Sequence, residues 1–69
     1  MKVKVICLGR SAKEIDTETG ATVEQAIKVA GFPEETSYNR QVNGHPAFDS
    51  DILQAGDILT LVPQVKGGR

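Results

Sequence analysis

The chain has 69 residues and a single cysteine, so it is expected to form one small domain with no disulfide and no Cys/His zinc cluster to stabilise it. Eight basic and nine acidic side chains give a net charge of −1, which argues against nucleic acid as a partner. Its apolar runs fall far short of the about 20 residues that cross a bilayer, and no signal peptide opens it, so we expect a cytoplasmic protein that does not bind a membrane. It has too few residues to enclose a substrate pocket, so we do not expect an independent enzyme.

The N-terminal residues predict a β-hairpin. Residues 2–8 alternate polar and apolar side chains and are rich in β-branched residues, which is typical of a strand with one buried face. A turn at residues 9–11 and a second strand at residues 12–16 follow. The side chains expected to point inward from the first strand are those of Met1, Val3, Val5 and Cys7. Cys7 is therefore interpreted as a small core residue, because a reactive thiol needs access to solvent.

A helix is predicted to start after Thr22. Thr22 and Gln25 have the spacing of a capping box, in which the threonine hydroxyl accepts from the Gln25 amide and the Gln25 side chain reaches back. Gly31 is placed to end the helix in a left-handed conformation, and Pro33 prevents its continuation. The apolar residues of this segment recur at helical spacing and predict one stripe facing a sheet: Val23, Ala26, Ile27 and Ala30.

Two short strands are predicted after the helix. Residues 40–43 form the first of them, and Asn43-Gly44 is a strong signal for a tight hairpin turn. Residues 45–48 then resume as a short, irregular strand, in which Pro46 favours a position at the edge of the sheet.

The remaining elements complete a small α+β fold. Residues 49–57 predict one helical turn closed by a glycine, and residues 58–62 predict the last strand. The element order β-β-α-β-β-β predicts a mixed sheet of four or five strands wrapped around one helix. The first and last strands are the most apolar, so we expect them to be parallel neighbours at the centre. This arrangement is the β-grasp.

Residues 1–63 are thus expected to form the domain, and residues 64–69 a flexible tail. Gly67 and Gly68 in that tail have no side chains to pack and lose the most conformational freedom when they are ordered. A backbone segment without side chains can, however, enter the narrow active site of another protein and present a carboxylate there. The alternative is an ordinary disordered terminus with no function.

Several motifs together resemble the ubiquitin-like β-grasp superfamily, and within it the MoaD/ThiS-type sulfur carriers. The motifs are Val42-Asn43-Gly44, Ala55-Gly56-Asp57, the apolar strand after it, and the ending Pro63-Gln64-Val65-Lys66-Gly67-Gly68. The order of elements covers essentially the whole chain, whereas the specific ending covers residues 55–68. Since one scaffold can serve several functions, the motifs are stronger evidence for the fold than for the function.

The resemblance implies a chemistry for Gly68. In this family an ATP-using adenylyltransferase activates the terminal glycine carboxylate, and attack by a persulfide or thiolate gives a thiocarboxylate or a thioester. The implied partners are that activating enzyme and a sulfur donor or acceptor enzyme, and no cofactor is bound by the carrier itself. A ubiquitin-like modifier conjugated through Gly68, and a non-covalent β-grasp interaction module, are the alternatives.

Arg69 departs from the family pattern, because the terminal carboxylate of the chain as written belongs to arginine. Ubiquitin-like proteins are often made as precursors, which implies a peptidase that cuts between Gly68 and Arg69. An arginine introduced by cloning is the alternative.

A partner-binding surface is also implied by the resemblance. The residues expected to alternate outward on the sheet face opposite the helix are Ile6, Leu8, Thr60 and Val62, and Pro63 and Val65 are expected to guide the tail. The alternative is that these side chains only fill the rims of the core. Lys66 is interpreted as a solvated spacer, with a contact to an acidic partner as the alternative.

The remaining polar residues predict no catalytic or metal site. His45 has no nucleophile or carboxylate arranged around it, so it is interpreted as an exposed turn residue. Asp49, Asp51 and Asp57 do not have the spacing of a calcium loop and are expected to cap turns.

Overall fold

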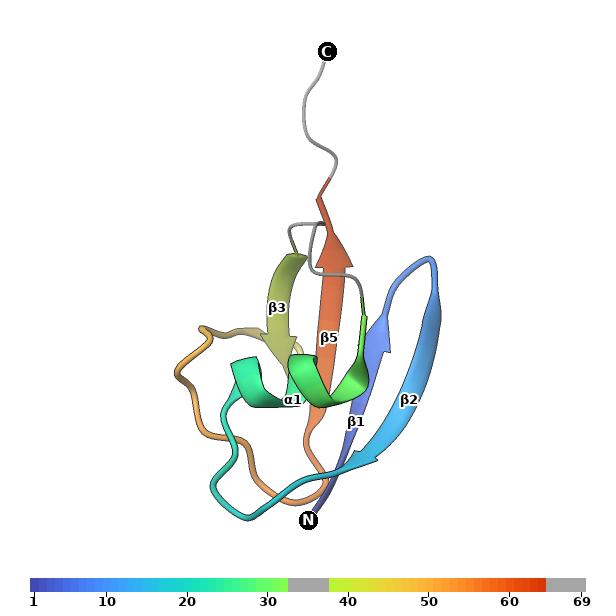
Figure 1. Ribbon diagram of the computed structural model, residues 1–69. Helices are drawn as coiled ribbons and strands as arrows, with labels where there is room; N and C mark the ends of the chain where they lie inside the picture. The colour runs from blue at the N-terminus through green and yellow to red at the C-terminus, as the bar shows by residue number, and fades with distance from the viewer. Residues whose placement is uncertain (33–37, 65–69) are drawn as a thin grey trace.

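The computed structural model describes residues 1–32 and 38–64 of the chain (Figure 1). Pro33, the predicted stop of the helix, therefore lies outside the described residues. Within them the elements follow the predicted order: β1 (Lys2–Cys7), β2 (Ser11–Asp16), α1 (Val23–Ala30), β3 (Tyr38–Val42), β4 (His45–Pro46) and β5 (Ile58–Pro63).

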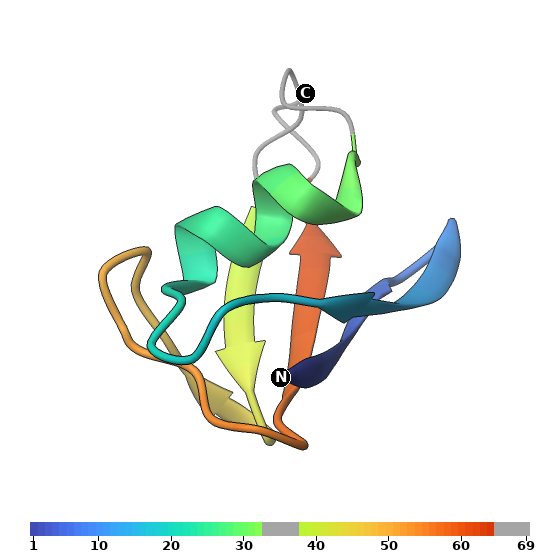
Figure 2. The ribbon, with the colours of Figure 1, turned by 60° about the horizontal axis from the view of Figure 1, so that its bottom comes forward.

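The strands form a five-stranded mixed sheet in the order β2-β1-β5-β3-β4. β1 and β5 are parallel neighbours at its centre, as predicted, and the other pairings are antiparallel. Helix α1 lies across one face of the sheet (Figures 1 and 2). This is the predicted ubiquitin-like β-grasp fold, and Pro46 does lie in the edge strand.

The core lies between α1 and the sheet. The inward positions of β1 and β5 are fully buried and consist of Val3, Val5, Cys7, Leu59 and Leu61. The four residues of the predicted helical stripe are buried against them. Met1 is only partly buried and packs at the rim of this cluster. Because the sheet is covered on one face by α1, the inward side chains of β1 and β5 are apolar. On β2 the inward Lys13 extends to the end of α1, where its Nζ donates to the Ala30 carbonyl at 2.8 Å.

The ends of α1 are formed by the residues that the sequence indicated. The Thr22 Oγ1 accepts a hydrogen bond from the Gln25 amide at 3.3 Å, and the Gln25 Oε1 accepts one from the Thr22 amide at 3.1 Å. Gly31 has a φ of 78° and its amide donates to the Ile27 carbonyl. The capping box and the left-handed glycine cap are both confirmed.

The prediction of a helical turn at residues 49–57 is wrong. This segment consists of two turns and an isolated bridge between Ile52 and Thr22. The reason is that two aspartate side chains bond to backbone amides in place of helical carbonyls: Asp51 accepts from Phe48 N–H at 2.9 Å, and Asp57 from Gln54 N–H at 2.8 Å.

Strand β4 is also shorter than expected, because its pairing with β3 covers only His45 and Pro46. One hydrogen bond, from the Ala47 amide to the Arg40 carbonyl at 2.9 Å, continues beyond it. Among the residues that the structure describes, no helix is both long enough and apolar enough to cross a membrane.

Candidate functional site: the uncovered sheet face and the end of β5

The sheet face opposite α1, called the outer face below, brings together three of the predicted partner-binding residues. Ile6 of β1 and Thr60 of β5 lie directly opposite each other in the parallel register, and both are half-buried. Val62, two residues further along β5, has the same orientation and is also half-buried. These side chains form the centre of the outer face.

Leu8 and Pro63 lie at the ends of the two central strands. Leu8 follows β1, and its amide donates to the Leu61 carbonyl at 3.0 Å, which extends the pairing of β1 with β5. Leu8 is 48% exposed. Pro63 is the last residue of β5 and lies opposite Tyr38 of β3. Val65, the other residue expected to guide the tail, lies outside the described residues.

Sequence reasoning missed one residue of this face. Ile58 is 41% exposed at the start of β5, next to Lys4 in the parallel register. It shares the outward orientation of Thr60 and Val62, and the period of two along this strand could have identified it.

Polar side chains border the apolar centre of the outer face. On one side the cross-strand pairs join Lys2 to Asp16 and Lys4 to Glu14, with opposite charges facing each other. On the other side Gln41 lies opposite Thr60 on the neighbouring strand. An apolar centre with a polar border is the usual composition of a protein-binding surface.

Two sequence motifs that are far apart in the chain meet at the start of β5. The Asn43 Oδ1 accepts from the Ile58 amide at 3.0 Å, and the Asn43 Nδ2 donates to Asp57 Oδ1 at 3.0 Å. Asn43 and Gly44 have φ values of 53° and 85°, the two positive values that a tight hairpin turn requires. The turn between β3 and β4 thus holds the beginning of the strand that leads to the tail.

β5 is paired on both sides and leads directly to the C-terminal residues (Figure 1). Gln64 is exposed and is the last residue that the structure describes. The predicted reactive residues Gly67 and Gly68, the spacer Lys66 and the processing position Arg69 lie outside the described residues. For this site the structure therefore describes strand β5 and Gln64, which precede the tail.

The other polar residues have structural roles. Cys7 is buried in β1, and His45 is exposed beside the hairpin turn. Asp49 forms an ion pair with the Arg40 Nε, whereas Asp51 and Asp57 accept from backbone amides. In residues 1–32 and 38–64, no group of three or more His, Cys, Asp or Glu side chains is arranged to hold a metal ion.

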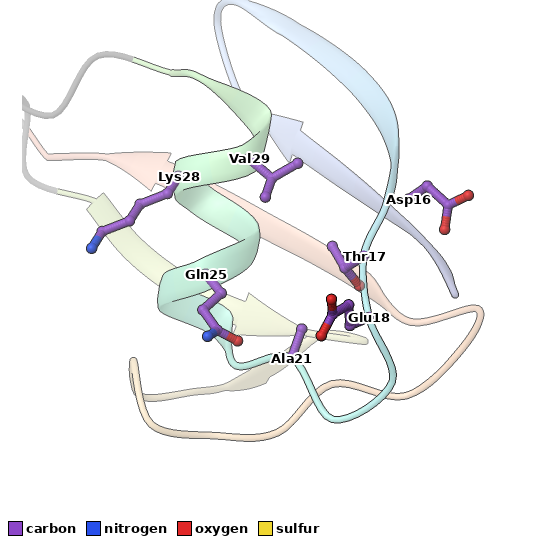
Figure 3. Close-up of a pocket in the computed structure, with 7 residues that line it drawn as sticks. All are labelled: Asp16, Thr17, Glu18, Ala21, Gln25, Lys28 and Val29. Atoms are coloured by element: carbon purple, nitrogen blue, oxygen red, sulfur yellow. The ribbon is translucent and has the colours of Figure 1, made fainter.

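A shallow pocket of about 410 Å³ lies between α1 and the loop that precedes it (Figure 3). Lys28 and Asp16 extend from it in opposite directions, and Asp16 bonds to the N-terminal ammonium of Met1 at 3.2 Å. The Gln25 amide oxygen is occupied by the capping box. The residues that line this pocket are Asp16, Thr17, Glu18, Ala21, Gln25, Lys28 and Val29.

The fold and the exposed end of β5 define a ubiquitin-like β-grasp protein, and comparisons agree. The chain is similar in structure to SAMP1 from Haloferax volcanii, with a TM-score of 0.79 and 21% identity over 99% of this chain and 100% of that one. It is similar to a protein of Pyrococcus furiosus assigned as molybdopterin converting factor, subunit 1, with a TM-score of 0.73 and 26% identity over 93% and 98%. A ubiquitin from Caldiarchaeum subterraneum gives a TM-score of 0.67 and 23% identity over 99% and 98%.

The family itself is identified by sequence. Residues 5–68 match the model of the ThiS family, so the chain belongs to this family. This confirms the predicted resemblance to the MoaD/ThiS-type carriers of the ubiquitin-like β-grasp superfamily, which are small carrier proteins and not themselves enzymes.

Proposed function

We propose that the chain is a sulfur carrier whose Gly68 carboxylate is adenylated by a partner enzyme and converted to a thiocarboxylate. The observation that carries this proposal is the extent of the family match, which runs through Gly67 and Gly68 and ends before Arg69. The glycine pair thus lies within the matched segment.

The chemistry needs an activating partner, because a free carboxylate repels nucleophiles and has a poor leaving group. In the first step a Gly68 carboxylate oxygen attacks the α-phosphorus of ATP, and pyrophosphate leaves. In the second step a persulfide sulfur attacks the carbonyl carbon of the mixed anhydride, and AMP leaves. A thiol then cleaves the S–S bond of the acyl persulfide, which yields the thiocarboxylate and a disulfide.

The fold provides the structural support from which the C-terminal tail extends. β5 is hydrogen-bonded to β1 and β3 on its two sides, so the tail starts from the middle strand of the sheet. The outer face next to it docks the activating adenylyltransferase through Ile6, Leu8, Thr60 and Val62, while Pro63 and Val65 direct the tail. Gly67 has no Cβ, which lets the backbone pass through a narrow channel.

Arg69 must be removed before Gly68 can react. With Arg69 attached, the Gly68 carbonyl is part of a peptide bond and cannot be adenylated. The free carboxylate then belongs to Arg69, whose long cationic side chain does not fit a channel shaped for glycine. A peptidase that cuts between Gly68 and Arg69 supplies the reactive form.

The test compares a chain ending at Gly68 with the chain ending at Arg69. Each is incubated with ATP and the family's adenylyltransferase from the same host, and exchange of labelled pyrophosphate into ATP is measured. We expect exchange only with the chain ending at Gly68, and none with a control ending at Gly67. Equal exchange with Arg69 present would contradict the processing step, and no exchange with any chain would contradict the carrier function.

A protein modifier is the second candidate, favoured by the similarity to a structure described as small archaeal modifier protein 1, with a TM-score of 0.75. It predicts an isopeptide bond between Gly68 and a target lysine, detected as adducts of higher mass in the host. A non-covalent interaction module, the third candidate, predicts that deleting Gly67 and Gly68 leaves partner binding unchanged.

A further inference from the structure

Two large apolar side chains are displayed on the loop between β4 and β5. Phe48 is 75% exposed and Ile52 is 68% exposed, the highest values among the large apolar residues that the structure describes. The other two aromatic residues, Phe32 and Tyr38, are buried at 7% and 6% exposure. Exposing Phe48 and Ile52 adds nothing to the core, so their placement calls for another explanation.

The loop that carries them is held rigidly. Phe48 and Asp51 are joined twice, by the Phe48 amide to the Asp51 Oδ2 at 2.9 Å and by the Asp51 amide to the Phe48 carbonyl at 3.0 Å. Leu53, one residue after Ile52, is buried in the core, and its amide donates to the Ala21 carbonyl at 2.8 Å. A fixed backbone lowers the entropic cost of binding, because the loop does not have to be ordered at that moment.

The same loop is fastened to the beginning of α1. The Asp49 carbonyl accepts from the Glu24 amide at 3.1 Å, and the Asp51 carbonyl accepts from the Val23 amide at 2.9 Å. The bridge between Thr22 and Ile52 lies beside them. The backbone of this loop is therefore held beside the first turn of α1. We call the exposed residues of the two segments the loop surface: Glu24, Phe48, Asp49, Asp51 and Ile52.

The loop surface is acidic. Its charged members are the three carboxylates of Glu24, Asp49 and Asp51. Two cations lie near them: Arg40, which is bound to Asp49, and Lys28, which follows Glu24 by one helical turn. The Asp49 side chain is 48% exposed despite this ion pair. Apolar anchors beside an excess of negative charge complement a partner with apolar side chains flanked by basic ones.

The loop surface lies apart from the end of β5. In Figures 1 and 2 the segment between β4 and β5 runs beside the start of α1 and toward the N-terminal end of β5. The tail follows in the sequence after Pro63, at the opposite end of that strand. A partner bound there would leave the end of β5 accessible.

We propose that the loop surface is a second docking site, for a partner protein segment whose apolar side chains are flanked by lysine or arginine. Phe48 and Ile52 bury the apolar side chains, and Glu24, Asp49 and Asp51 pair with the basic ones. The site does not depend on the chemistry proposed for Gly68, and it allows a second protein to be held while the tail is engaged elsewhere.

The test uses nuclear magnetic resonance of the ¹⁵N-labelled chain, titrated with a blocked hexapeptide of alternating arginine and leucine. We expect amide shifts confined to residues 22–24 and 47–53, with a Kd of about 0.1–1 mM. The double variant Phe48→Ser/Ile52→Ser is expected to bind at least tenfold more weakly. Its matched control is Val29→Ser, which removes a side chain that is 56% exposed on α1 and is expected to keep the wild-type affinity.

The charge requirement is tested separately. A peptide with glutamate in place of arginine is expected to cause no shifts, and Glu24→Gln is expected to weaken the arginine peptide several-fold, whereas Glu14→Gln on β2 leaves it unchanged. Equal shifts with both peptides, shifts centred on Ile6 and Thr60, or no shifts at all would overturn the proposal. Concentration-dependent shifts of these residues without peptide would also overturn it, because a second copy of the chain would then cover the surface.

Discussion

At the scale of single residues, Asn43 shows how a turn residue contributes to a distant site. Its backbone adopts a positive φ in the hairpin turn, and its side-chain amide joins that turn to Asp57 and Ile58. Asparagine is one of the few residues other than glycine that readily adopt this conformation. The Val42-Asn43-Gly44 motif is therefore explained by the structure as the clamp at the start of β5.

Replacing Asn43 by alanine is expected to lower the free energy of unfolding by about 2 kcal/mol, since two hydrogen bonds are lost and the positive φ becomes strained. Urea denaturation measures this change. Asn39→Ala, an exposed asparagine on β3, serves as the control and is expected to stay within about 0.5 kcal/mol. A similar small effect for both variants would show that the clamp does not stabilise the fold.

Leu8 tests the role proposed for the outer face. Leu8→Asp places a charge where the activating enzyme would dock, so we expect the KM of adenylation to rise at least tenfold, which corresponds to about 1.4 kcal/mol or more of lost binding. Because Leu8 is 48% exposed, the melting temperature should change little. Val29→Asp, on the opposite side of the molecule, is the matched control, and an equal rise in KM for both variants would argue against the outer face.

At the scale of elements, local signals predicted α1 well and the segment after β4 poorly. The capping box, the apolar stripe and the glycine cap all lie within α1 itself, so the sequence was sufficient. Residues 49–57 carry aspartates and a closing glycine that fit a helical turn equally well, but their side chains bond to the amides of Phe48 and Gln54. This choice depends on anchoring of the loop by Leu53 and by α1, which is a non-local effect.

Asp51→Ala tests this correction. The variant leaves the Phe48 amide without its carboxylate partner, and we expect the free energy of unfolding to fall by about 1 kcal/mol. Hydrogen exchange at the Phe48 amide should accelerate in parallel. Ser50→Ala, in the same turn, is the control and should leave both quantities close to wild type; unchanged exchange in Asp51→Ala would contradict the assigned bond.

At the scale of the whole molecule, the sequence predicted the topology but only part of the surface. The most apolar strands, β1 and β5, were correctly expected at the centre of the sheet. The central strands lie beneath the helix, so their inward side chains are buried and have to be apolar. The period of two placed Ile6, Thr60 and Val62 on the outer face. The exposure of Phe48 and Ile52 was not predictable, since nothing local distinguishes an apolar loop residue that packs from one that is displayed.

The domain boundary proposed at residue 63 leads to a prediction for the intact fold. Ending the chain at Gln64 should leave the free energy of unfolding within about 0.5 kcal/mol of the full chain, because every core residue that the structure describes lies upstream of it. The same truncation should abolish adenylation. A large loss of stability, measured by thermal unfolding, would show that residues 65–69 belong to the folded unit.

The most direct test of the central claim is the intact mass of the protein isolated from its host. We expect a chain that has lost Arg69, together with a species heavier by about 16 daltons, the difference between sulfur and oxygen at the Gly68 carboxyl group. A protein that retains Arg69 throughout and carries no added sulfur would contradict it.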